Sequence, residues 1–181
     1  GRADAELCLR PRVEHQYARA SYEINLDCNF SCQHCYHGGG HARGLNWEDR
    51  LRVLQTLHDA GVLWLQLSGG EPTIDPLFPD TYAHAWDAGM VMSVLTNGSM
   101  LSNRRILDVF TARPAHQISV SVYGARESSY EAVTRSRGSF KRFLRGVEAG
   151  VEAGLPLRLH IVPTSMTDSE ESAMEALAAR F

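Results

Sequence analysis

The sequence has little of what marks membrane, secreted or nucleic-acid-binding proteins. No hydrophobic run approaches the length of a membrane-spanning helix, and we recognise no signal peptide. The net charge is only −3 and the basic residues are scattered, so we expect neither a membrane nor a nucleic-acid partner. Only four cysteines occur, three of them in one short segment, which is not the pattern of a disulfide framework. The chain is therefore expected in the cytoplasm.

The composition fits one folded domain. The chain has 181 residues, of which 44% are hydrophobic and 22% charged. Residues 1–19 show no clear periodicity of hydrophobic residues and are interpreted as a lead-in segment. Residues 20–181 are interpreted as the domain. Five apolar segments predict strands: Ser21–Asp27, Val62–Ser68, Val91–Thr96, Gln117–Tyr123 and Leu157–Pro163. Between and after them we expect helices over 46–61, within 77–88, from Ser102, over 139–154 and from Asp168.

Alternation of strands and helices predicts an α/β fold with a parallel sheet. The strands are apolar on one side only. In the fourth segment, for example, Ile118, Val120 and Val122 alternate with Ser119 and Ser121. A closed barrel fills its centre with branched apolar side chains, so a polar inner face predicts an open barrel that surrounds a ligand.

The most informative segment is Cys28-Asn29-Phe30-Ser31-Cys32-Gln33-His34-Cys35-Tyr36, directly after the first predicted strand. Three thiolates on one loop can hold three irons of a [4Fe–4S] cluster and leave the fourth iron open to a small molecule. The alternative is a structural zinc ion, with His34, His37 or His41 as fourth ligand. Zinc sites usually combine two short pairs of Cys or His ligands from separate segments, and a second such pair is missing from this sequence.

A second motif, Ser68-Gly69-Gly70-Glu71-Pro72, ends the second predicted strand. Glycines allow a ligand to approach the backbone closely, and a carboxylate such as Glu71 suits an ammonium group. Alone, the motif would be an ordinary turn. Together the two motifs resemble the radical S-adenosylmethionine (radical SAM) enzyme family.

This resemblance implies a partial βα barrel of about six units, of which five are visible. It also implies that Cys28, Cys32 and Cys35 ligate a [4Fe–4S] cluster, and that the open iron binds S-adenosylmethionine. The reduced cluster would then cleave this cofactor to methionine and a 5′-deoxyadenosyl radical, which abstracts hydrogen from a substrate. Further cofactor-binding candidates implied by the resemblance are His34, Tyr36, Ser68, Gly69, Gly70, Glu71, Asn97, Ser121, Arg135 and His160. For His34, Arg135 and His160, a surface or structural role explains the residue equally well, and Arg137 competes with Arg135.

The segments Ser121-Val122-Tyr123-Gly124 and Gly138-Ser139-Phe140 resemble the peptide-modifying SPASM and twitch members. The resemblance therefore favours a ribosomally made peptide or a protein side chain as substrate, and an electron donor such as flavodoxin or ferredoxin. Three alternatives stay open: a zinc-stapled protein-binding module, an enzyme of haem or cofactor biosynthesis, and a degenerate radical SAM domain that binds its cofactor or a peptide without turnover. Because no sixth unit follows, we expect a truncated chain, which could be inactive on its own.

Overall fold

The computed structural model describes residues 18–38, 42–162, 164 and 168–181. Most of the expected lead-in segment therefore lies outside the described residues, as do His41 and Pro163. Five parallel strands form one sheet in the order in which they occur along the chain. They are β1 (Arg19–Glu23), β2 (Trp64–Ser68), β3 (Val91–Thr96), β4 (Gln117–Val122) and β5 (Leu157–Ile161).

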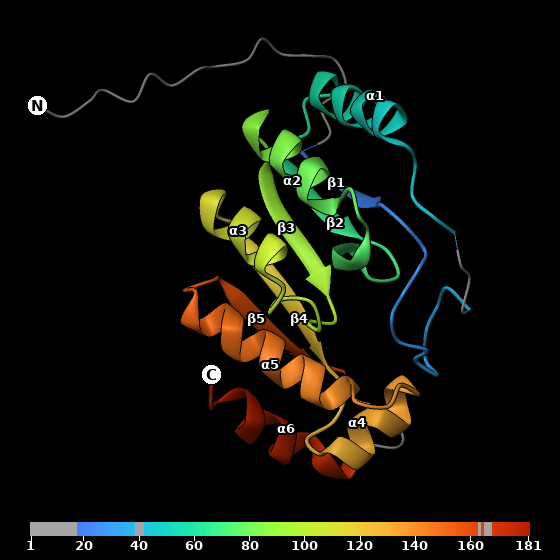
Figure 1. Ribbon diagram of the computed structural model, residues 1–181, viewed down its shortest axis with the longest axis vertical. Helices are drawn as coiled ribbons and strands as arrows, with labels where there is room; N and C mark the ends of the chain where they lie inside the picture. The colour runs from blue at the N-terminus through green and yellow to red at the C-terminus, as the bar shows by residue number, and fades with distance from the viewer. Residues whose placement is uncertain (1–17, 39–41, 163, 165–167) are drawn as a thin grey trace, which may run out of the picture.

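Helices connect the strands. They are α1 (Trp47–Asp59), α2 (Phe78–Asp87), α3 (Arg104–Ala112), α4 (Glu127–Thr134), α5 (Ser139–Glu152) and α6 (Glu171–Ala178), with short 3-10 turns η1 (Pro72–Ile74) and η2 (Asp168–Glu170). Crossovers between parallel strands are right-handed, so a sheet built in sequential order carries its helices on one face. The helices are grouped along one side of the sheet accordingly (Figure 1). The expected α/β partial barrel is confirmed.

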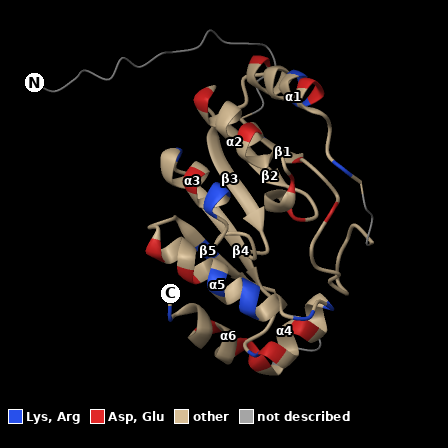
Figure 2. Ribbon diagram, viewed as in Figure 1, with Lys and Arg blue, Asp and Glu red and all other residues tan. Residues whose placement is uncertain are grey.

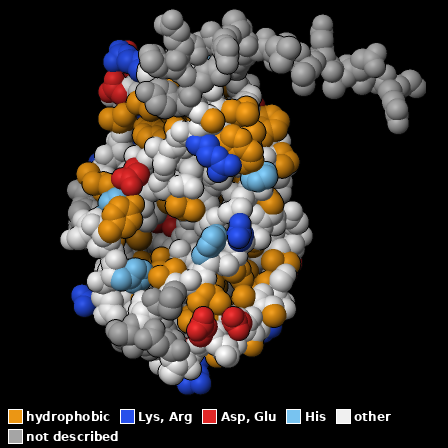
Figure 3. Space-filling model, turned by 180° about the vertical axis from the view of Figure 1, so that it is seen from behind, with side chains coloured by type: hydrophobic (Ala, Val, Ile, Leu, Met, Phe, Trp, Pro, Cys, Tyr) orange, Lys and Arg blue, Asp and Glu red, His pale blue; other side chains and the backbone are white. Residues whose placement is uncertain are grey.

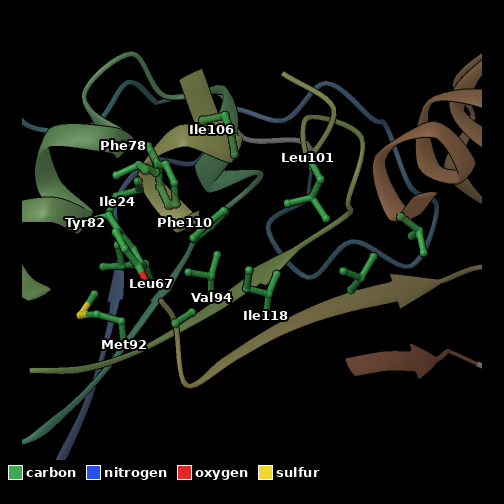
Figure 4. Packing of buried hydrophobic residues seen from close by; sticks show 14 of the residues in the cluster. Ile24, Leu67, Phe78, Tyr82, Met92, Val94, Leu101, Ile106, Phe110 and Ile118 are labelled. Carbon is green, nitrogen blue, oxygen red and sulfur yellow. The ribbon is translucent and has the colours of Figure 1, made fainter. Parts of the chain in front are cut away.

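The core lies between the sheet and these helices. Leu67, Met92, Val94 and Ile118 of the strands pack against aromatic side chains of α2 and α3 (Figure 4). Among these, the rings of Tyr82 and Phe110 lie 5.1 Å apart in an edge-to-face arrangement, which is a favoured geometry for aromatic pairs. The side chains at alternate strand positions bury against the helices, as the sequence predicts.

The opposite sheet face is more polar. Ser21, Gln66, Ser93 and Ser121 lie there, exposed or half-buried. Seen from behind, the molecule shows mainly uncharged polar atoms and apolar side chains, with isolated charged groups between them (Figure 3). No helix in the described residues combines the length and apolar character needed to cross a membrane.

Several boundaries differ from the expected ones. β1 ends at Glu23 rather than Asp27, because Asn25 and Asp27 turn their carbonyl groups to the backbone of Gly70 and Glu71. Asn103, not Ser102, caps α3 and accepts a hydrogen bond from the backbone of Arg105. Asp168 begins a 3-10 turn, and α6 starts only at Glu171. Helix α4 was not expected.

Candidate active site

The three cysteines lie in the connection between β1 and α1, at the carboxyl edge of the sheet. The backbone of Cys35 donates to the carbonyl oxygen of Cys32 at 3.1 Å, and that of Gly38 donates to Cys35 at 3.1 Å. These consecutive turns keep the segment compact, and all three thiols are free and half-buried. The carboxyl edge of such a sheet is where barrel enzymes form their active sites.

The end of α4 holds the cysteine loop in place. The backbone of Ser31 donates to the carbonyl oxygen of Thr134 at 2.9 Å, and that of Gln33 donates to Val133 at 3.0 Å. A third hydrogen bond joins the backbone of Ser31 to Ser136 Oγ at 3.2 Å. The unexpected helix thus anchors the predicted metal-binding loop from a point about a hundred residues further along the chain.

The two glycines after β2 lie directly against the start of the same loop. Gly69 has a φ of +139°, and a Cβ atom at this position would lie 2.2 Å from the carbonyl oxygen of Asn25. At Gly70 a Cβ would lie 2.4 Å from the carbonyl oxygen of Asp27. Only glycine allows these two backbones to approach so closely. The glycines therefore have a packing role in addition to the one expected toward a ligand.

Glu71 has no exposed surface. Its carboxylate accepts hydrogen bonds from the backbone of Thr73 (3.1 Å), from the Thr73 hydroxyl, from the Thr96 hydroxyl (2.7 Å) and from the backbone of Asn97 (2.6 Å). Burial raises the pKa of Glu71, and these hydrogen bonds oppose the rise. Glu71 borders neither cavity described below, so in this conformation it braces the ends of β2 and β3.

Asn97 links the buried Glu71 carboxylate to the cysteine loop. Its side-chain Nδ2 donates to Asn29 Oδ1 at 2.9 Å and lies 3.9 Å from Cys28 Sγ. Its Oδ1 accepts from the backbone of Ser99 at 2.9 Å. The network Glu71–Asn97–Cys28 therefore runs continuously from a buried carboxylate to a predicted cluster ligand.

Two adjoining cavities are bordered by all three cysteines. The smaller, of about 190 Å³, collects most of the expected cofactor-binding residues: His34, Tyr36, Ser68, Gly69, Gly70, Asn97 and Ser121. The larger, of about 380 Å³, is bordered by Arg135. Arg135 ends α4 with a φ of +49°, a left-handed conformation that costs a residue with a side chain roughly 1 kcal/mol. His160 borders neither cavity and is exposed on β5, where it pairs with Ser121 across the sheet.

Tyr123 was not among the expected residues, although it borders the smaller cavity. Its ring lies 5.1 Å from that of His34, and burial raises the pKa of its phenol. Residues two apart on a strand share a face, so the expectation for Ser121 could have been extended to Tyr123. His37 was expected only as a zinc ligand. It borders both cavities, and its buried Nε2 lacks a hydrogen-bond partner among the described residues.

Burial also controls the chemistry of the thiols. It raises the pKa of Cys28, and together with the neighbouring thiols it raises the pKa of Cys32 to about 12. Both thiols therefore carry their protons at neutral pH, and a metal must displace these protons to bind.

The arrangement of the thiols bears on which metal centre they fit. Within the described part of the chain, no three His, Cys, Asp or Glu side chains converge closely enough to hold one ion. The three cysteines instead border a shared space beside Gly70. Each thiolate of a [4Fe–4S] cluster binds a different iron, so this arrangement fits a cluster better than a lone zinc ion.

Comparison with known proteins gives consistent results. The family model described as the radical SAM superfamily matches residues 22–177. The AdoMet-dependent heme synthase of Methanosarcina barkeri is 27% identical over 143 residues, which are 77% of this chain and 41% of that protein. Mycofactocin maturase MftC of Mycolicibacterium smegmatis is 27% identical over 183 residues, with 94% of this chain and 46% of that protein covered. The chain thus spans less than half the length of these curated relatives.

Among solved structures, SuiB of Streptococcus suis bound to its precursor peptide SuiA superposes with a TM-score of 0.78 at 16% identity. The match covers 91% of this chain and 37% of SuiB. SuiB bound to S-adenosylmethionine gives a TM-score of 0.75 at 18% identity, over 90% of this chain and 37% of SuiB. At this level of identity the likeness shows the fold.

Proposed function

Because the chain belongs to the radical SAM superfamily, we propose that Cys28, Cys32 and Cys35 hold a [4Fe–4S] cluster and that S-adenosylmethionine binds in the adjoining cavity. When bound, the pair supplies reductive cleavage of the cofactor and a carbon radical able to abstract hydrogen from an unactivated position. One observation carries this proposal: the cysteines, the glycine turn and Ser121 border the same 190 Å³ cavity. They come from the ends of β1, β2 and β4, far apart in the sequence.

The protein's part is to bind and orient. The Cys loop, anchored on α4, would hold the cluster in one position. Gly69 and Gly70 border the cavity without side chains, so the polar end of the cofactor can approach their backbone, and Ser121 offers a hydroxyl from β4. Tyr123 and His34 provide aromatic surface beside them, which suits a planar base. We assign Glu71 the role of positioning Asn97 and the β2 end.

A peptide is the substrate class that the comparisons favour. MftC, by its name a maturase, matches 94% of this chain, and SuiB has the same fold with a precursor peptide bound. The open polar face of the sheet can accept an extended chain beside the cavity. The match to a heme synthase keeps haem biosynthesis as a second candidate, since it covers 77% of this chain at the same identity.

Anaerobic reconstitution with iron and sulfide tests the cluster. We expect about four irons and four sulfides per chain, and methionine plus 5′-deoxyadenosine after reduction with S-adenosylmethionine present. Cys32→Ala should lose the cluster. Cys8→Ala is the matched control, because Cys8 is the one cysteine outside the motif. Full iron content in Cys32→Ala, or one tightly bound zinc in the wild type, would contradict the proposal.

The substrate class needs a separate test. A short precursor peptide encoded beside this chain, labelled with deuterium, should transfer deuterium to 5′-deoxyadenosine. Deuterium-labelled iron-coproporphyrin in the same assay tests the second candidate, haem biosynthesis. Transfer from the porphyrin but not from the peptide would favour haem biosynthesis.

A further inference from the structure

One segment stands out from the even charge distribution of the chain. Residues 135–145 contain five basic residues and no acidic one, although the whole chain has a net charge of −3. We call this the basic segment; it comprises Arg135, Arg137, Lys141, Arg142 and Arg145. It covers the turn between α4 and α5 and the first half of α5, where stretches of the ribbon are coloured blue for Lys and Arg (Figure 2).

The basic segment borders the cysteine loop. The guanidinium of Arg142 lies 5.5 Å from the centre of the Phe30 ring, and Phe30 lies between Cys28 and Cys32 in the sequence. Ser136 accepts a hydrogen bond from the backbone of Ser31, and Arg135 borders the larger cavity together with all three cysteines. A molecule bound to this segment would therefore lie beside the predicted cluster, outside the polar face of the sheet.

Nearby acids neutralise the segment only in part. Lys141 Nζ lies 3.4 Å from Glu127, an exposed pair of little energetic weight. Glu131 accepts a hydrogen bond from the backbone of Gly138 at 2.6 Å. Exposed Glu148 lies one turn beyond Arg145 on α5, so among the described residues positive charge prevails at the start of this helix, where the helix N-terminus adds positive partial charge. Arg137, Lys141 and Arg145 are exposed, and the weak surface pair of Lys141 with Glu127 leaves all three accessible to an acidic partner.

We infer that the basic segment is the docking surface for an acidic one-electron carrier protein that reduces the cluster. This inference rests on the proposed function. The carrier loses one electron and the [4Fe–4S] centre gains it, with no bond made or broken in the step. Weak redox encounters use small interfaces, and their rates depend on charge complementarity. A cationic surface next to the cysteine loop favours approach of an acidic carrier on the side of the molecule that borders this loop.

The test measures cluster reduction in the reconstituted protein. Reduced flavodoxin is mixed anaerobically in a stopped-flow instrument at low salt, and cluster bleaching gives the second-order rate. The variant Arg137→Glu/Lys141→Glu/Arg145→Glu should lower this rate at least tenfold, because electrostatic steering raises association rates by roughly 10- to 1000-fold. The wild-type rate should fall with added salt and the variant rate should not.

Two controls separate a docking defect from other effects. Arg52→Glu/Arg104→Glu/Arg105→Glu makes the same charge change on α1 and α3, where the three arginines are also exposed, and should leave the rate within twofold. Photoreduced deazaflavin, a small donor that needs no docking surface, should reduce all three proteins equally.

The remaining outcomes would overturn the inference. Equal losses in both triple variants would make net charge the cause, and slow reduction by deazaflavin would indicate a damaged cluster. A variant that accepts electrons normally but binds substrate peptide or RNA poorly would assign the segment to that partner. A wild type that assembles no reducible cluster would refute the proposed function and this inference together, whereas normal assembly without a rate difference would refute the inference alone.

Discussion

Glu71 provides the sharpest test of the site, because the motif and the structure indicate different roles for its carboxylate. The motif predicts a carboxylate that meets the ammonium of the cofactor. The structure shows a carboxylate with no exposed surface that accepts four hydrogen bonds from Thr73, Thr96 and Asn97. Replacing Glu71 by Gln separates the two roles, since the side chain keeps its shape and loses its charge and one acceptor.

The expected cost follows from the hydrogen bonds. If the Gln oxygen remains on the Thr73 side, its NH₂ group faces the backbone N–H of Asn97, and that donor is left unpaired. An unpaired buried donor costs about 1–3 kcal/mol. We therefore expect Glu71→Gln to lower the free energy of unfolding by about 1–3 kcal/mol in urea titrations of the protein without cofactor. Glu148→Gln, the same change at an exposed position of α5, should stay within about 0.5 kcal/mol of the wild type.

The pH dependence gives an independent check. Burial raises the pKa of Glu71 in the folded state above its ordinary value of 4.5. The folded protein then binds this proton more tightly than the unfolded chain, so the residue contributes most to stability at low pH and least above the folded pKa. The difference between the wild type and Glu71→Gln should therefore be larger at pH 5 than at pH 8. A Glu71→Gln variant that is as stable as the wild type at both pH values, but binds S-adenosylmethionine weakly, would refute the structural role of Glu71. That result would favour direct contact between Glu71 and the cofactor.

Three further predictions concern the scaffold and the thiols. Arg50→Met should cost about 3–5 kcal/mol in urea unfolding, because Asp75, 2.7 Å from the buried guanidinium, would lose its partner; a loss below 1 kcal/mol would contradict this. Gly146→Ala should destabilise α5 by more than about 2 kcal/mol, since its Cβ would lie 1.9 Å from the carbonyl oxygen of Gly98. Gly150→Ala meets only the flexible side chain of Leu157, at 2.9 Å or more, and should be near neutral because alanine favours the helix. Equal effects of the two substitutions would be inconsistent with this packing. Because burial and the neighbouring thiols raise the pKa of Cys32 to about 12, this thiol in the cluster-free protein should react with iodoacetamide at pH 8 at least about 100-fold more slowly than in urea. Mass spectrometry measures the labelling, and equal rates in the folded and unfolded protein would contradict the burial of Cys32.

The sequence was sufficient for the parts of the fold that rest on local pattern. Five strands and the alternation of apolar and polar side chains follow from hydrophobic periodicity, and the cap of α1 by Asn46 follows from its residue type. Helix α4 escaped detection because it has only eight residues and its N-cap is Arg126, which is not a usual capping residue. Its importance is non-local: only the tertiary structure shows that its end binds the cysteine loop.

The same distinction applies to the site. The spacing of Cys28, Cys32 and Cys35 predicts a shared metal centre because the ligands are neighbours in the chain. The surroundings of Glu71 could not be predicted, because its partners Thr96 and Asn97 lie 25 and 26 residues away on another strand end. A carboxylate that follows two glycines has the same sequence pattern whether it faces a ligand or is enclosed by donors. Deciding between these requires the geometry of β3.

Sheet topology explains why these distant residues meet. In a parallel sheet of sequential order, the segments after successive strands leave from the same edge and lie side by side. The cysteine loop after β1, the glycine turn after β2 and Asn97 after β3 therefore adjoin one another. Ser121 of β4 and Tyr123, directly after β4, complete the wall of the smaller cavity. Asn97 contacts both Glu71 and Cys28, so two hydrogen bonds connect the glycine turn to the cysteine loop. On the proposed function, we therefore expect substitutions at Glu71 or Asn97 to alter cluster binding and cofactor binding together.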